Sequence, residues 1–60
     1  MPEFVKVADA PNRSVTATIV QMLDAYGITA FVKTGGGGQQ EIWVTENHAL
    51  VARQLLEPRD

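Results

Sequence analysis

Hydrophobic and polar residues follow two different patterns along this chain, and the changes of pattern divide it into five segments. Three short segments are rich in β-branched and aromatic residues and are bounded by turn-forming residues, as β-strands are. In two longer segments the apolar residues recur every three or four positions, which is typical of amphipathic helices. The sequence therefore predicts strands at about 3–7, 28–34 and 41–45 and helices at about 13–26 and 46–57.

The first expected helix has a signal at each end. Asn12 can accept a hydrogen bond from a backbone N–H of the first turn, and Gly27 can take the left-handed conformation that follows a last turn. The spacing of apolar residues predicts which side of this helix is buried. The expected buried residues are Val15, Ile19, Met22 or Leu23, and Tyr26.

The second expected helix follows Thr45, a residue type that can cap a helix, and stops before Pro58. Its acidic first-turn residue, Glu46, lies where the helix dipole favours negative charge. The expected buried stripe consists of Ala49, Ala52, Leu55 and Leu56, together with Leu50 or Val51.

The order β-α-β-β-α, without a repeat or a linker, predicts a single α+β domain spanning residues 1–60. A right-handed helical crossover and a local hairpin place the third strand between the first two, antiparallel to both, with both helices on one face. We therefore expect a ferredoxin-like fold with sheet order 1-3-2. The first strand then has an unpaired edge, which is a template for another chain.

One hairpin register satisfies the side-chain pattern of both strands. Residues opposite each other on paired strands share a face of the sheet. A favourable register therefore pairs aromatic with aromatic residues, threonine with threonine, and opposite charges with each other. It pairs Lys33 with Glu41, Phe31 with Trp43 and Thr29 with Thr45. The other face is aliphatic, and we expect it to form the core under the helices with Val5, Val7, Ala30, Val32, Ile42 and Val44.

The face without helices is the candidate interaction face, where Phe4, Phe31 and Trp43 would form an aromatic row across three strands. Its expected residues are Phe4, Lys6, Phe31, Lys33, Glu41 and Trp43. Such a face suits self-association into a homodimer or higher homo-oligomer, docking of a partner protein or small effector, or stacking of unpaired bases. The net charge of -2, with five scattered Lys and Arg residues, argues against nucleic acid.

The glycine run, formed by Gly35, Gly36, Gly37 and Gly38, raises the question of a phosphate-binding loop. A Walker loop places its Lys and Ser or Thr after the glycines and directly before a helix. Here Lys33 and Thr34 precede the glycines and a strand follows them. We therefore expect a hairpin turn that is closed by Thr34 with Gln40 or by Gly35 with Gln39.

Candidate catalytic residues are few. The chain has no cysteine, His48 is its one histidine, and Ser14 has no base near it in the sequence. We expect no enzyme activity, no metal and no cofactor. The composition, 45% hydrophobic and 20% charged, is that of a folded globular domain. Without a signal peptide or a membrane span in the sequence, we expect a cytoplasmic protein.

The assembled pattern resembles a family of short bacterial signal-transducing proteins of unknown function with a PII-like, ferredoxin-like fold. The resemblance rests on FVKVADAPN, on LDAYGI before TAFVKT, and on EIWVTENHALVARQLLE, in which Val44, Ala52, Leu55 and Leu56 match the family pattern. It implies a β-α-β-β-α domain with a regulatory or binding role and brings no catalytic residues. In PII proteins the loop between the second and third strands recognises effectors and partners, and the glycine run here is shorter.

Together these observations predict a non-enzymatic regulatory or protein-interaction module that self-associates through its open sheet face or edge. The alternative is a module that binds single-stranded nucleic acid or a nucleotide on the aromatic face.

Overall fold

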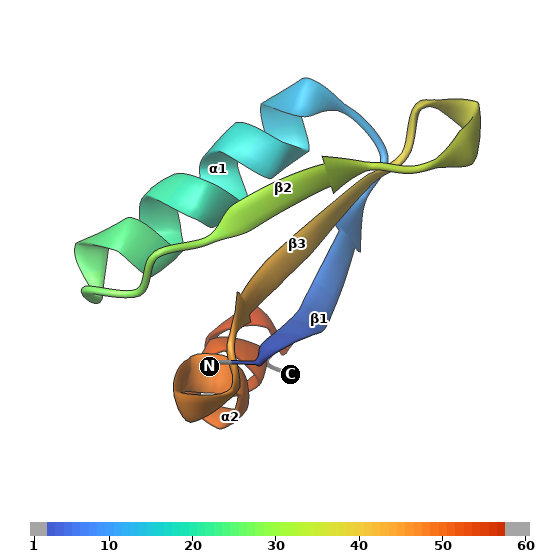
Figure 1. The fold of residues 1–60 in the computed structure, drawn as a ribbon. Coiled ribbons are helices and arrows are strands. Elements are labelled where there is room, and N and C mark those ends of the chain that lie inside the picture. Colours follow the sequence, from blue (N-terminus) through green and yellow to red (C-terminus); the bar gives the residue numbers. More distant parts are fainter. Residues whose placement is uncertain (1–2, 58–60) are drawn as a thin grey trace.

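The structure is a computed structural model that describes residues 3–57, and in them a three-stranded antiparallel sheet is joined to two helices (Figure 1). The sheet order is β1-β3-β2, as the sequence predicts for an α+β fold of ferredoxin-like order. The elements are β1 (Phe4–Ala10), α1 (Arg13–Ala25), β2 (Phe31–Thr34), β3 (Gln40–Thr45) and α2 (Glu46–Leu56), with a short 3-10 turn at Gly36–Gly38.

β1 is longer than expected and contains a β-bulge. The strand continues to Ala10 instead of stopping near Val7, and its register with β3 shifts between Lys6 and Ala8. A bulge inserts one extra residue, so side chains beyond it exchange faces. Ala10 is therefore buried on the helix side, whereas Asp9 points to the open side and is exposed.

β2 is shorter than expected because its first three predicted residues leave the ladder. The strand begins at Phe31, so the β2–β3 ladder does not reach Thr29, and the predicted pairing of Thr29 with Thr45 is wrong. Ile28 belongs to the end of α1, where its N–H donates to the carbonyl oxygen of Leu23 at 2.9 Å. The side chains of Ile28 and Leu23 also lie together in the core.

α1 has the ends that the sequence predicts. The Asn12 side chain accepts a hydrogen bond from the N–H of Val15 at 3.0 Å. Gly27 follows the helix with φ of 79° and donates its N–H to the carbonyl oxygen of Asp24 at 2.9 Å. With the Ile28 bond, this is a Schellman motif, which satisfies carbonyl groups that a helix end leaves free.

The buried side of α1 is rotated from the predicted one. Thr16 and Leu23 are buried, and Ile19 and Val20 pack partly against the core. The predicted stripe was wrong at its two ends, because Val15 and Tyr26 are exposed. Thr16 tolerates burial because its hydroxyl donates to the carbonyl oxygen of Asn12 at 3.0 Å.

α2 approaches the sheet through small residues. Ala49 and Ala52 are buried, and Leu55 packs partly against the core. The prediction that Leu50 or Val51 joins this stripe was wrong, since Leu50 is 69% exposed and Val51 is also exposed. Thr45 stands at the N-cap, but its side chain makes no capping bond and lies 3.2 Å from Nδ1 of His48.

The core lies between the helices and one face of β1 and β3. Its fully buried large side chains are Leu23, Ile42 and Val44, each worth about 1.5–3 kcal/mol on burial. Val5 and Val7 pack against it as predicted, but Val32 does not, being 45% exposed. The helices contact β1 and β3 far more than β2, so β2 is exposed on both faces. Among residues 3–57, neither helix is both long and apolar enough to cross a bilayer.

Candidate functional site

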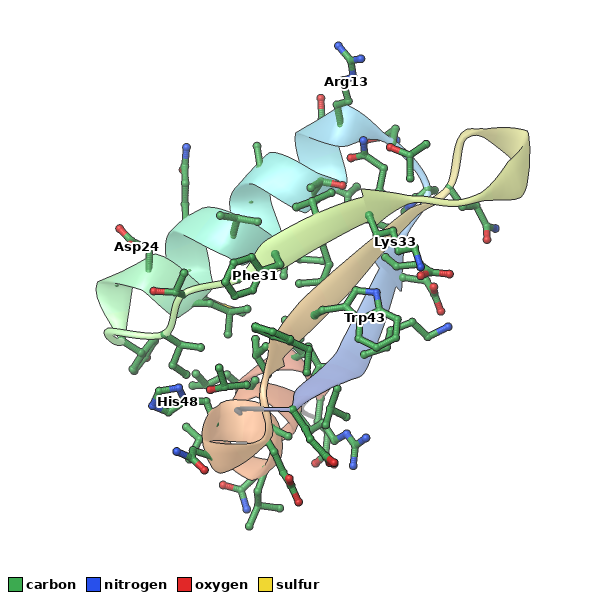
Figure 2. All side chains as sticks on the ribbon, in the orientation of Figure 1. Arg13, Asp24, Phe31, Lys33, Trp43 and His48 are labelled. Carbon is green, nitrogen blue, oxygen red and sulfur yellow. The ribbon has the colours of Figure 1, made fainter. Side chains whose placement is uncertain are left out.

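The open face is the side of the sheet opposite the helices, and the register places all six residues of the predicted interaction face on it. These residues are Phe4 and Lys6 of β1, Phe31 and Lys33 of β2, and Glu41 and Trp43 of β3. The bulge adds Asp9. In Figure 2 the side chains of Lys33 and Trp43 lie close together over the sheet.

The ladder arranges this face in three rows across the strands. One row pairs Phe4 with Thr45, and the charged row at the other end joins Asp9, Glu41 and Lys33. Lys6, Trp43 and Phe31 form the middle row. The aromatic residues therefore do not stand in one straight row as predicted, because Phe4 is displaced by one pair along the sheet.

The two phenylalanine rings nevertheless meet across β3. Their centroids are 4.8 Å apart with an interplanar angle of 78°, an edge-to-face contact. Such a pair contributes about 0.5–1.5 kcal/mol beyond the area it buries. The side chains still expose much of their surface, because Phe4 is 46% and Phe31 47% exposed. The contact orders the rings without removing them from water.

Trp43 is held in place by two charged neighbours. Its Nε1 donates a hydrogen bond to Oε1 of Glu41 at 3.1 Å, and Nζ of Lys33 lies 5.9 Å from the ring centroid. Lys33 and Glu41 are ladder partners, as predicted, but each of them contacts Trp43. An exposed cation over an aromatic ring contributes about 0.5–1 kcal/mol. The indole is therefore oriented before any partner arrives.

These aromatic residues border an apolar hollow of about 390 Å³. Its lining residues are Phe4, Phe31, Val32, Lys33 and Trp43. The volume lies at the small end of ligand sites, which measure roughly 300–1,000 Å³. Among the described residues that line it, Lys33 is the one that carries a charge, so the hollow suits an apolar or aromatic group.

The charges of the open face balance each other. Lys6 forms an ion pair with Asp9 at 3.4 Å, and Lys33 and Glu41 add one charge of each sign. Both members of the ion pair are well exposed, so it contributes only about 0–1 kcal/mol. The sequence did not predict Asp9 on this face, because the run Ala-Asp-Ala-Pro at 8–11 is turn-like and the first strand was expected to end at Val7.

The glycine run forms the tip of the β2–β3 hairpin. The last ladder pair is Thr34 with Gln40, and the N–H of Gly35 donates to the carbonyl oxygen of Gln39 at 2.8 Å. Gly37 and Gly38 have φ of 71° and 81°, which glycine adopts without steric cost. A β-carbon at Gly36, Gly37 or Gly38 would meet no atom within 4 Å. The run makes the turn and lines no site.

The residues considered for catalysis do not converge. Ser14 is exposed on α1, and His48 is exposed in the first turn of α2 beside Thr45. Within residues 3–57, no group of three His, Asp or Glu side chains is placed to hold a metal ion.

Comparisons of the chain with protein-family models, with curated proteins and with solved structures found no match. The resemblance to the signal-transducing family therefore stays a prediction.

Proposed function

We propose that this protein is a non-enzymatic, cytoplasmic interaction module with a regulatory role, which self-associates through the open face of its sheet. The observation that carries the proposal is the pair of ordered but half-exposed rings, Phe4 and Phe31, beside the oriented ring of Trp43. Monomeric proteins seldom leave a large contiguous apolar patch in water unless another molecule covers it.

The size of the core supports a second copy as that molecule. A 60-residue domain buries only about 60% of the surface that its unfolded chain exposes. The sheet here has helices on one face, and within residues 3–57 the fully buried large side chains are just Leu23, Ile42 and Val44. A second sheet against the open face would give the domain a second apolar layer, which is the usual architecture of sheet proteins.

The sheet edges are less suited to self-association than the face. β1 carries a bulge and the exposed charges of Lys6 and Asp9, both of which discourage pairing with another strand. β2 offers only four residues, Phe31–Thr34, for an edge-to-edge ladder. We therefore place the contact on the face.

A regulatory role follows if an effector or a partner protein competes with the second copy. The hollow beside Phe31 and Trp43 could accept an apolar or aromatic group, and its occupation would prevent two faces from meeting. The fraction of dimer would then fall when the ligand is present. The signal-transducing resemblance of the sequence points to the same role.

Sedimentation velocity over a range of protein concentrations tests the proposal. We expect the mean mass of the wild type to rise with concentration, and Trp43 emission to shift to the red on dilution. Phe31→Ser should prevent both changes. Leu50→Ser is the matched control, because Leu50 is an exposed apolar residue on α2, and this variant should associate like the wild type.

A strictly monomeric wild type at high concentration would refute the proposal, as would association that Leu50→Ser abolishes and Phe31→Ser does not. The same samples test the alternative with a single-stranded oligonucleotide at low salt. Salt-sensitive quenching of Trp43 in a monomeric protein would assign the face to nucleic acid. The balanced charges of Lys6, Asp9, Lys33 and Glu41 lead us to expect no quenching.

A further inference from the structure

We infer the geometry of the dimer: the two open faces pack about a twofold axis parallel to β3, so that β1 of one copy lies over β2 of its partner and Asp9 faces the partner's Lys33. The inference rests on the proposed self-association and adds to it a specific pair of contacts. It follows from how the charges and rings are distributed over the face.

A symmetric face-to-face dimer centred on Trp43 has two simple arrangements. The twofold axis lies between the sheets and runs either along the strands or across them. An axis along the strands keeps each row of side chains at its own level and exchanges the two edge strands. An axis across the strands places each strand over the same strand of the partner and inverts the order of the rows.

With the axis along the strands, opposite charges meet. The charged row places Asp9 of β1 over the partner's Lys33 of β2, and symmetry makes this contact twice. The middle row places Lys6 over the ring of the partner's Phe31, a cation–π arrangement, and Trp43 over the partner's Trp43. Glu41 faces the partner's Glu41, but the hydrogen bond from Nε1 of Trp43 and the neighbouring Lys33 offset part of its negative charge.

With the axis across the strands, the contacts become unfavourable. Lys6 then faces the partner's Lys6 in the middle row, and Phe4 lies over the partner's Asp9. Lys33 then has no carboxylate opposite it. Like charges placed together at an interface suppress association, so this arrangement is disfavoured.

The area of the face sets the strength of association. Three strands about 4.8 Å apart and six residues of about 3.4 Å each cover roughly 14 by 20 Å. This is smaller than a standard interface, which buries about 800 Å² on each partner. We therefore expect a weak, reversible dimer, in which two exposed charge contacts change the measured affinity.

Charge reversal tests the inferred contact directly. Lys33→Glu alone places a carboxylate against the partner's Asp9, and Asp9→Lys alone places an ammonium group against the partner's Lys33. Each single variant should raise the dimer Kd by roughly five- to tenfold at low ionic strength, since two contacts change from attraction to repulsion. An equimolar mixture of the two variants should recover association. In the mixed dimer one contact joins the two substituted side chains and the other joins the original Asp9 and Lys33. Both contacts then pair opposite charges.

The mixture is the decisive sample, since recovery there cannot arise within one chain. The matched controls are Arg13→Glu and Asp24→Lys, which reverse the same charges on α1, away from the open face (Figure 2). We expect both controls to keep the wild-type Kd, alone and mixed. High salt should reduce the effect of the face variants.

The outcomes separate this inference from the proposal beneath it. If the wild type associates and Phe31→Ser prevents association, but the mixture is no tighter than the single variants, the inferred geometry is wrong and the face remains the interface. If the wild type does not associate at all, the proposed self-association fails, and the geometry fails with it.

Discussion

The four glycines between β2 and β3 should differ sharply in what they contribute to stability. Gly37 has φ of 71° and ψ of 14°, a left-handed conformation that costs an L-residue about 1–2 kcal/mol. Gly36 does not have a positive φ. A β-carbon at either position meets no atom within 4 Å, so sterics with the rest of the chain play no part.

The two alanine substitutions are therefore matched in everything except backbone conformation. Any Gly→Ala change restricts the unfolded chain, which stabilises the fold by about 0.4–1 kcal/mol where the conformation is compatible. Gly36→Ala should show this gain. In Gly37→Ala the strain exceeds it, for a net loss of up to about 1.6 kcal/mol. We expect Gly36→Ala to be more stable than Gly37→Ala by about 1–2 kcal/mol.

Urea unfolding followed by circular dichroism, at a concentration where the protein is monomeric, measures the difference. Gly37→Asn is a useful third variant, because asparagine tolerates the left-handed region and should fall between the other two. Equal unfolding free energies for Gly36→Ala and Gly37→Ala would refute the conformation of the turn. Because the tip lines no part of the open face, the Gly36→Ala variant should keep the wild-type dimer Kd.

Two further predictions test the fold. Asn12→Ala removes the side chain that accepts from the Val15 N–H, and should lower the unfolding free energy by about 1 kcal/mol in the same urea assay; no change would show that the cap is not formed. Ile42→Ala should cost about 2–5 kcal/mol. Its ladder partner Val32, which is 45% exposed, should tolerate alanine with a change within about 0.5 kcal/mol. Similar losses for Ile42→Ala and Val32→Ala would contradict the exposure of β2.

The sequence was sufficient for the features that depend on short-range pattern. The period of apolar residues located all five elements, Asn12 and Gly27 marked the ends of α1, and the hairpin register paired Phe31 with Trp43. These features are local because a cap, a turn or a hairpin pair is determined by residues that are close in the chain. The sheet order followed from the same elements through the handedness of the crossover.

Burial on each element was harder to predict, since it depends on where neighbouring elements lie. Val32 alternates correctly for a core position, yet it is exposed because the helices cover β1 and β3 instead of β2. Leu50 falls within the apolar pattern of α2, but the helix rests on Ala49 and Ala52 and turns Leu50 to solvent. A hydrophobic residue in a periodic pattern can be buried only if another element is there to cover it.

The open face shows the same division between local pattern and long-range packing. The sequence alone was enough to place Phe4, Phe31 and Trp43 on one face, because side chains alternate along strands of known pairing. The position of Asp9 on that face depends on the folded chain, since the bulge in β1 arises where the strand fits against β3 and brings Ala10 into the core. The charge that completes the inferred contact with Lys33 is therefore a product of packing, which no short stretch of sequence records.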